Sequence, residues 1–520
     1  MSKKIDKIVI VGGGSAGWMS ASTIKAIVPD KEIIVIESEN VPIIGVGEST
    51  VGGIRNWLYI LGIKDQDFMN FTDATYKLAI KFNNFYEKDK GTWYYPFGEP
   101  YHSENLHHTN DWFIKKILFP TSPEEDYVDY FYPQMALVKQ NKLSTLPGEP
   151  FDFYYDTAFH FDATKFGAWL RENYCKPRGV KHIESEVIEI ETDETGIKSL
   201  RLANGEIISA DLYVDCTGFR SLLLEQTFKV PFISYEQVLP NNRAWATRIP
   251  YTNKEKQLTT VTDCTAHANG WIWNIPLWSR IGTGYVYCDR FISPEKALDD
   301  FKLYLINNDF DISNAEFRDI QIKTGIHEKI WHKNTVALGL SAGFIEPLES
   351  TGLVTVYEFA INLCRALSRG ERVSQWDQDE FNLVCKDVFN YYTQFVSMHY
   401  ALSHRNDSDY WKAVGEKSYI EFFKNVNDLH TGGLYQQTIH SKCYNWRMLE
   451  DRGMHCLSAG MNWMPIDKVV LKKINSPNTD VYRDMEETLL RMNTRKQKWR
   501  EAAKNCPSAY EFYRTIIYKN

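Results

Sequence analysis

The sequence predicts an α/β fold that opens on a βαβ unit and ends in a mainly helical segment. An apolar run, Ile8–Val11, is followed by a glycine-rich turn, a helical stretch through Ile27 and a second apolar run, Ile33–Ile36, which ends at Glu37. From about residue 378 onward helical patterns dominate. The chain therefore reads as α/β for most of its length and as helical towards its C-terminus.

Further elements follow in order between these two ends. Gly205 separates two alternating runs, of which the second, Ala210–Gly218, reads as a strand. Residues 336–341 give another short strand. A helix is expected over Leu353–Arg369, closed by Gly370.

Composition excludes several classes of protein. The 520 residues carry a net charge of −8, which argues against a nucleic-acid partner. Aromatic residues make up 14% of the chain, too many for a largely disordered protein. The nine cysteines form no CxxC pair, which indicates reduced thiols and no metal site. Since no apolar run is long enough for a membrane span or a signal peptide, we expect a cytoplasmic protein without a membrane partner; a homo-oligomer stays open.

The glycine-rich turn has the spacing of a dinucleotide-binding motif, Gly12-x-Gly14-x-x-Gly17. Its glycines would allow a tight turn, the approach of a pyrophosphate, and close packing of helix on strand. Glu37, twenty residues beyond Gly17, stands where a carboxylate would bind a ribose hydroxyl. The alternative is a turn that merely packs. The motif alone does not separate FAD from NAD, but residues 211–218 (DLYVDCTG) resemble a flavoprotein strand and favour FAD.

Several motifs together resemble the flavin-dependent halogenases of the tryptophan-halogenase family. They are GGGSAGWMSA (12–21), IGVGEST (44–50), KLAIKF (77–82), the WxWxIP signature at Trp271, Trp273, Ile275 and Pro276, FIEPLESTG (344–352) and HYALSHRNDSDYW (399–411). The resemblance runs from about residue 6 to about residue 465.

This resemblance implies a flavin-monooxygenase-like, Rossmann-type lobe over residues 1–400 and a mainly helical substrate-binding lobe over 401–520. Segments around 77–130 would contribute to the substrate site. Reduced FAD, supplied by a separate NAD(P)H-dependent flavin reductase, would react with O₂ and oxidise a halide ion to hypohalous acid, which reaches a lysine beside an aromatic substrate. The expected cofactor contacts are Gly12, Gly14, Ser15, Ala16, Gly17, Glu37, Gly47, Glu48, Ser49 and Leu338.

The family register selects Lys77 as the catalytic lysine, where it would hydrogen-bond hypohalous acid or form a haloamine. Lys81 lies four residues on and would share a face with Lys77 in a helix or a strand, so spacing cannot choose between them. The same register selects Glu349 as the catalytic carboxylate, with Glu346 as its competitor. Glu349 would also stabilise the dipole of the helix that follows.

Thr351 and Gly352 match the family's halide site at the start of that helix, where free N–H groups attract anions. Ser350 or Thr351 could instead cap the helix. Trp271 and Trp273 alternate, so they would share one face of a strand. With Ile275 and Pro276 they are expected to keep the substrate away from the flavin, and the alternative is ordinary core packing.

The chain departs from the tryptophan-specific pattern at the substrate. Tyr95 stands where a histidine is usual, while Phe97 matches a stacking aromatic residue. Leu449 occupies the place of a substrate-stacking tryptophan, and Gln437, Thr438 and Tyr444 replace the polar and aromatic residues that hold the amino acid. Pocket candidates are Tyr95, Phe97, Ser350, Trp446 and Trp463.

We therefore expect an indole-like or phenolic small molecule rather than free tryptophan as substrate, with bromide or iodide rather than chloride. An aromatic hydroxylase and a non-catalytic flavin-binding protein are the rival interpretations.

Overall fold

The computed structural model describes residues 3–39, 48–101, 109–119, 126–144, 150–154, 156–370, 372–422, 452–463, 472, 475–476 and 480–519. Two compact units emerge, and both are discontinuous in sequence. Unit 1 comprises residues 1–74, 161–236 and 321–392, and unit 2 comprises 75–160, 237–320 and 393–520. The lobe boundary expected at residue 400 stays a prediction, but the units interleave along the chain.

Unit 1 is built on a six-stranded sheet that contains the predicted βαβ unit. Its strand order is β20 (Trp331–His332), β21 (Thr335–Ala337), β12 (Leu212–Asp215), β1 (Lys7–Val11), β2 (Glu32–Glu37) and β8 (Lys181–Glu184). β1 runs parallel to both of its neighbours, β12 and β2. The helix between β1 and β2 is α1 (Ser15–Ile27), so the predicted strand–helix–strand opening is confirmed.

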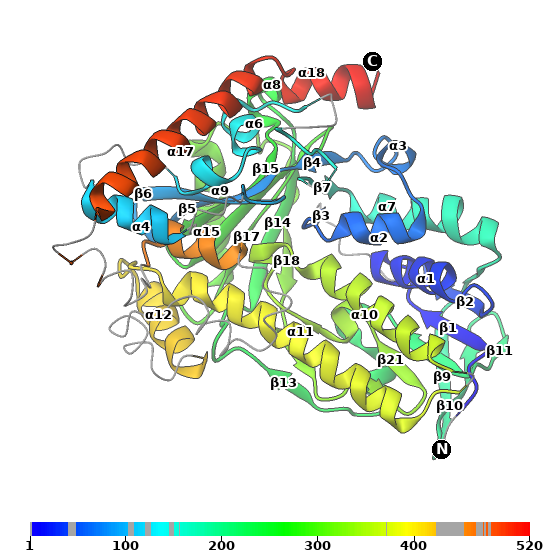
Figure 1. Ribbon diagram of the computed structural model, residues 1–520. Helices are drawn as coiled ribbons and strands as arrows, with labels where there is room; N and C mark the ends of the chain where they lie inside the picture. The colour runs from blue at the N-terminus through cyan, green and yellow to red at the C-terminus, as the bar shows by residue number, and fades with distance from the viewer. Residues whose placement is uncertain are drawn as a thin grey trace. The chain divides into compact units, whose positions relative to one another are not determined.

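α1 lies beside α7 (Ala163–Trp169) and α10 (Gly352–Ser368), as Figure 1 shows. The predicted helix over 353–369 is thus confirmed to within a residue at each end. The strand expected at 336–341 is shorter than predicted. It ends at Ala337, because Gly339 takes a left-handed conformation (φ +70°) and a 3-10 turn, Gly339–Ser341, follows.

Smaller elements complete unit 1. They are β3 (Glu48–Ser49), α2 (Ile54–Leu61), α3 (Asp65–Phe68), β9 (Val187–Asp193), β10 (Gly196–Leu202), β11 (Ile207–Ile208), β13 (Phe232–Ser234), β19 (Gly325–His327) and β22 (Gly343–Phe344). The strands β11, β10 and β9 form one three-stranded sheet, and β13, β19 and β22 form another. Ile197, Leu200 and Leu202 of β10 pack with Val9 and Val11 of β1 in one apolar core.

Unit 2 is built on a seven-stranded sheet. Its order is β18 (Arg318–Gln321), β14 (Arg243–Ile249), β17 (Ile281–Tyr287), β16 (Gly270–Pro276), β15 (Val261–His267), β5 (Ala79–Glu87) and β6 (Lys90–Pro96). β5 runs parallel to β15, while β16 is antiparallel to both β15 and β17. α9 (Pro294–Asn307) covers β17 with Ala297, Phe301 and Leu305. A short strand, β4 (Thr75–Lys77), pairs antiparallel with β7 (Ala158–Phe161).

The remaining helices of unit 2 are α4 (Thr109–Leu118), α5 (Val128–Phe131), α6 (Met135–Gln140), α8 (Lys254–Gln257), α12 (Asp409–Phe422), α15 (Arg452–Gly460), α17 (Val481–Lys504) and α18 (Ala509–Phe512). α11 (Gln375–Ala401) belongs partly to each unit. α17 contacts α4, α5 and α6 and buries Met485, Met492 and Trp499 on one face. Figure 1 shows α17 beside α4 and α6. No helix in the described ranges carries an apolar stretch long enough to cross a bilayer.

Candidate active site

The glycine-rich turn between β1 and α1 has the geometry that its spacing predicts. Gly12 has φ +112°, and a Cβ there would lie 2.3 Å from the carbonyl oxygen of Cys216. A Cβ on Gly17 would lie 1.8 Å from the carbonyl oxygen of Gly12, so only glycine lets α1 pack this closely. A Cβ on Gly14 would meet nothing within 4 Å. The turn therefore packs closely at Gly12 and Gly17 and leaves free space at Gly14, at the N-terminus of α1, as a pyrophosphate-binding turn requires.

Glu37 ends β2 beside this turn. Its Oε2 lies 3.0 Å from Nε2 of His182 and 3.3 Å from Nη1 of Arg171. A Cβ on Gly13 would lie 2.2 Å from the carboxyl carbon of Glu37. The Glu37 side chain therefore occupies space that is free only because residue 13 is glycine. Oε2 thus has two nitrogen neighbours, and the carboxylate lies at the edge of the turn where a ribose hydroxyl would be bound.

The other expected cofactor contacts gather around the start of α1. The Ser15 hydroxyl donates to the carbonyl of Ala163 (2.9 Å), and a Cβ on Gly339 would lie 2.8 Å from that of Ala16. The Leu338 N–H donates to the carbonyl of Asp215 (2.9 Å). Gly47 lies outside the described residues.

Glu48 opens β3 and carries a perturbed carboxyl group. Burial, reinforced by the charge of Asp162, raises the pKa of Glu48 to about 7. Its neighbour Ser49 accepts a hydrogen bond from the hydroxyl of Ser350 (3.0 Å). This bond joins β3 to the segment that precedes α10.

The N-terminus of α10 is buried and lacks a side-chain cap. Ser350 takes a left-handed conformation (φ +59°), and Thr351 is the N-cap residue. Capping by either hydroxyl, the alternative that the sequence left open, is wrong. Thr351 is helical (φ −82°, ψ −8°), whereas a capping residue is usually extended. The Thr351 hydroxyl is buried and makes no hydrogen bond to the described part of the chain. Unused N–H groups and a buried hydroxyl suit a small anion.

A 3-10 turn, Pro347–Glu349, leads into this helix; Glu346 precedes the turn and Glu349 is its last residue. Glu346 is 0% exposed and Glu349 is 2% exposed. Burial therefore does not choose between the two carboxylates, and the assignment of Glu349 stays a prediction.

Lys77 ends β4 and is 0% exposed. Its Nζ lies 5.0 Å from the centre of the Phe97 ring, on the ring face, which attracts a cation. The residue opposite Lys77 in β7 is Ala158, whose small side chain leaves room for the lysine stem. Lys77 is therefore a buried amine against an aromatic face rather than a solvated surface charge.

Lys81 occupies a different environment. The expectation that Lys77 and Lys81 share a strand face is wrong, because the chain changes sheets at Leu78 and Lys81 belongs to β5. Lys81 makes an ion pair with Asp263 (2.9 Å), and this partner raises its pKa against the opposing effect of burial. Of the two lysines, Lys77 is the fully buried one, whereas the side chain of Lys81 is 29% exposed.

The WxWxIP signature forms β16, so the predicted strand is confirmed. Trp271 and Trp273 are 1% and 6% exposed, and their ring centres are 6.0 Å apart. Gly284 of β17 makes room for Trp273, since a Cβ there would lie 2.1 Å from the indole ring. Pro276, the last residue of the signature, accepts a hydrogen bond from the Thr75 hydroxyl (2.6 Å). The signature thus contacts the strand that carries Lys77.

An aromatic group continues from Phe97. Tyr95 lies 6.0 Å from Phe97 and 6.0 Å from Phe395 between ring centres. Gly453 of α15 faces the Tyr95 hydroxyl, which would lie 3.1 Å from a Cβ at that position. Trp463 is buried. Trp446 and the replaced positions Gln437, Thr438, Tyr444 and Leu449 lie outside the described residues.

Sequence reasoning missed two buried residues near Lys77, namely His160 and Thr75. His160 of β7 lies opposite Thr75, the residue two positions before Lys77. The only local signal was a histidine within the apolar run Ala158–Phe161.

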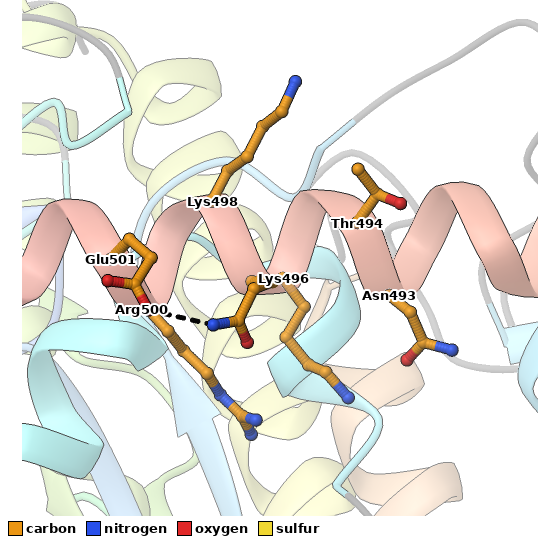
Figure 2. Close-up of a pocket in the computed structure, with 7 residues that line it drawn as sticks. Asn493, Thr494, Lys496, Lys498, Arg500 and Glu501 are labelled. Atoms are coloured by element: carbon orange, nitrogen blue, oxygen red, sulfur yellow. Dashed lines mark hydrogen bonds between the residues drawn. The ribbon is translucent and has the colours of Figure 1, made fainter.

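A shallow hollow of about 790 Å³ lies elsewhere, on α17 (Figure 2). Its lining residues are Asn493, Thr494, Lys496, Gln497, Lys498, Arg500 and Glu501. It contains none of the predicted site residues. Within the described ranges, no group of three or more His, Cys, Asp or Glu side chains is arranged to hold a metal ion.

The fold and the glycine turn define an α/β protein of the dinucleotide-binding type. The family model of tryptophan halogenases matches residues 7–471. Tryptophan 6-halogenase ThaL of Streptomyces albogriseolus is 31% identical over 89% of this chain and 91% of its own length.

Two solved structures extend this likeness. One is described as the VirX1 apo structure, with a TM-score of 0.89, 36% identity, and coverage of 99% of this chain and 100% of that one. The other is BrvH, a flavin-dependent halogenase from Brevundimonas sp. BAL3, with a TM-score of 0.84, 27% identity, and coverage of 99% and 100%.

The chain belongs to the tryptophan halogenase family. It is a flavin-dependent halogenase, an oxidoreductase of a family that uses FADH₂, a halide ion and O₂. Members of the family act on aromatic substrates and receive reduced flavin from a separate reductase.

Proposed function

We propose that this halogenase acts on a free, electron-rich aromatic small molecule, indole-like or phenolic, rather than on free tryptophan, and that it prefers bromide or iodide to chloride. Support for the first part comes from Tyr95, which replaces the usual histidine and is accommodated by Gly453. Support for the second part is chemical, because bromide and iodide are oxidised more easily than chloride.

The observation that carries the proposal is the environment of Lys77. An amine that is fully buried against the face of Phe97 is shielded from water, and so is any oxidant bound to it. The amine would either hydrogen-bond hypohalous acid or exchange a proton for the halogen, with loss of water. An aromatic carbon then takes the halogen and releases its proton, for which we propose Glu349 as acceptor.

The turn at the start of α1 fits FAD. There is free space beside Gly14 for a pyrophosphate, whereas Gly12 and Gly17 are packed against the backbone. Gly12, Gly14, Ser15, Ala16 and Gly17 would hold the pyrophosphate, and Glu37 the ribose. Glu48, Ser49 and Leu338 would lie beside the flavin. When bound, the reduced cofactor would supply two electrons to O₂, which would take two more from the halide, so that one oxygen atom ends in hypohalous acid and the other in water. The halide itself would lie at Thr351 and Gly352, where the Thr351 hydroxyl, which has no hydrogen-bond partner in the described part of the chain, and the helix N–H groups offer donors.

We propose that Trp271, Trp273, Ile275 and Pro276 form a wall that keeps the aromatic substrate from the flavin. Tyr95, Phe97, Ser350, Trp446 and Trp463 are the proposed pocket residues. The near-complete burial of Trp271 and Trp273 supports a fixed wall, since neither ring has solvent to move into.

The test is a reconstituted reaction with FAD, a flavin reductase, NADH, O₂, each halide in turn and a panel of indoles and phenols. A halogenated product that depends on halide is expected, with a lower yield from free tryptophan. Oxygenated product formed without halide would favour a hydroxylase. Tight FAD binding without formation of hypohalous acid would favour a non-catalytic flavin-binding protein.

Lys77→Met sharpens this test, with Lys81→Met as the matched control. Lys77→Met should lose at least about 100-fold in halogenated product while hypohalous acid still forms and can be trapped with a β-diketone. Lys81→Met breaks the pair with Asp263 and should lower stability more than product. The reverse order of effects on product would move the role to Lys81.

A further inference from the structure

His160 and Thr75 share with Lys77 one buried face of the β4–β7 pair. Directly opposed residues of an antiparallel pair lie on the same face, and Thr75 is opposite His160 while Lys77 is opposite Ala158. Lys77 lies two residues after Thr75, and side chains two residues apart in a strand point to the same face. All four residues are 0% exposed. Each polar group on this face therefore needs a partner within the protein.

Hydrogen bonding fixes the protons of this face. The Thr75 hydroxyl donates to the carbonyl oxygen of Pro276 at 2.6 Å, and that oxygen can only accept. Nδ1 of His160 lies 3.1 Å from the same hydroxyl oxygen. The Tyr513 hydroxyl, which accepts from the N–H of Tyr76 at 2.6 Å, is a further hydrogen-bond partner of the Thr75 side chain. With the Thr75 proton directed at Pro276, Nδ1 of His160 carries a proton and donates it to Thr75.

The second ring nitrogen then acts as an acceptor. Burial, with the charge of Lys77 as the smaller cause, holds the pKa of His160 well below its ordinary value, so the ring is neutral. Its Nε2 lies 2.9 Å from the Thr262 hydroxyl of β15, which donates to it. The chain of donors is thus Thr262 to His160, His160 to Thr75, and Thr75 to Pro276.

We propose that His160 is a positioning residue for Lys77, acting through the hydroxyl of Thr75, which ties the strand of the amine to the last residue of the WxWxIP signature. This inference rests on the proposed role of Lys77. The network links β4, β7, β15 and β16 by neutral groups, so it fixes the amine without adding a carboxylate that would pair with it. Loss of one link would let β4 shift, and a misplacement of about 1 Å can cost about 100-fold in rate.

The test compares two substitutions at Thr75. Thr75→Val removes the hydroxyl at nearly constant volume, and Thr75→Ser keeps it. The matched control is Thr247→Val. Thr247 is also a buried threonine of unit 2, and its hydroxyl donates to a backbone carbonyl, that of Glu316, at 2.8 Å. Two quantities are measured for each variant: halogenated product, and hypohalous acid trapped with a β-diketone in the absence of substrate.

Thr75→Val should lower the product formed per hypohalous acid by about 10-fold, while the rate of hypohalous acid formation stays within about 2-fold. Thr75→Ser should restore most of the ratio, and Thr247→Val should leave it unchanged. An unchanged ratio in Thr75→Val, or an equal loss in Thr247→Val, would overturn the inference. A wild-type protein that forms no hypohalous acid would instead overturn the proposed function.

A second measurement does not depend on turnover. In protein with ¹⁵N-labelled histidine, the signals of His160 should show a neutral ring protonated at Nδ1, with no titration between pH 6 and 9; assignment uses the loss of these signals in His160→Asn. Asparagine can place an N–H near the position of Nδ1. His160→Asn should therefore form more halogenated product per hypohalous acid than His160→Gln. A ring protonated at Nε2 alone, or one that titrates near 6.5, would contradict the network.

Discussion

Two helices of unit 1, α1 and α10, begin without a side-chain cap, and their surroundings differ. At α1 the N-cap residue is Gly14, which is extended and where an added Cβ would meet nothing within 4 Å. At α10 the N-cap residue is Thr351, which is buried and follows Ser350 in a left-handed conformation. Neither helix has an acidic residue in its first turn. Both ends therefore attract anions through the same N–H groups and helix dipole.

The difference shows how one physical device can serve two anions. Open space above Gly14 suits a large group such as a pyrophosphate, which brings its own hydrogen-bond acceptors. The enclosed end at Thr351 offers one hydroxyl and a few N–H groups, which suits a single small ion. Size selection at each helix would then come from the neighbouring residues rather than from the helix.

The largest effect is expected from Gly14→Asp. An extended N-cap aspartate should stabilise α1 by a few tenths of a kcal/mol, because it accepts from the first N–H groups. The same carboxylate should repel the pyrophosphate by about 3 kcal/mol, which corresponds to about 100-fold weaker FAD binding. Thermal unfolding and flavin fluorescence titration would measure the two quantities. Gly14→Ala adds volume without charge and serves as the control; an equal loss of FAD affinity there would show that space, not charge, decides.

A smaller effect is expected at the other helix. Thr351→Val keeps the volume of the side chain and removes the hydroxyl that we propose to contact the halide. Loss of a hydrogen bond to an anion costs about 1.5–3 kcal/mol, so the KM for halide should rise about 10-fold or more, with kcat changed less. The control is Thr355→Val, one turn along, whose hydroxyl donates to the carbonyl of Gly352 (3.1 Å). If both variants raise the KM equally, the Thr351 hydroxyl is not a halide contact.

Features of the fold that depend on neighbours in sequence were predictable. The strand–turn–helix around Gly12–Gly17, the end of β2 at Glu37 and the helix after Gly352 all follow from local patterns, and the structure confirms each. Capping by Thr351 was also a local prediction, and it failed because a left-handed residue, Ser350, places the next residue in a helical conformation.

Features that depend on distant partners were not predictable from patterns. The break between Lys77 and Lys81 arises because Leu78 donates to the carbonyl of Thr260 (2.7 Å) and accepts from the N–H of Phe97 (2.9 Å). His160 obtains its role from Thr75 and Thr262, which are 85 and 102 residues away along the chain. A single histidine in an apolar run carries no local sign of such partners.

The smallest effect concerns Glu48. Its neighbour in sequence, Ser49, accepts a hydrogen bond from Ser350 at the start of α10. The folded pKa of Glu48 is raised from 4.5 to about 7, so the folded protein holds a proton between these values that the unfolded chain has lost. Its free energy of unfolding should therefore fall as pH rises from about 4.5 to about 7 and stay lower above. Urea unfolding of the FAD-free proteins would measure this change. From pH 5 to pH 8, the free energy of unfolding of the wild type should fall by on the order of 1 kcal/mol more than that of Glu48→Gln. Glu32→Gln is the control. The exposed Glu32 pairs with Lys181, which lowers its pKa, so it is ionised throughout this range. A slope in Glu48→Gln equal to that of the wild type would assign the pH dependence to groups other than Glu48.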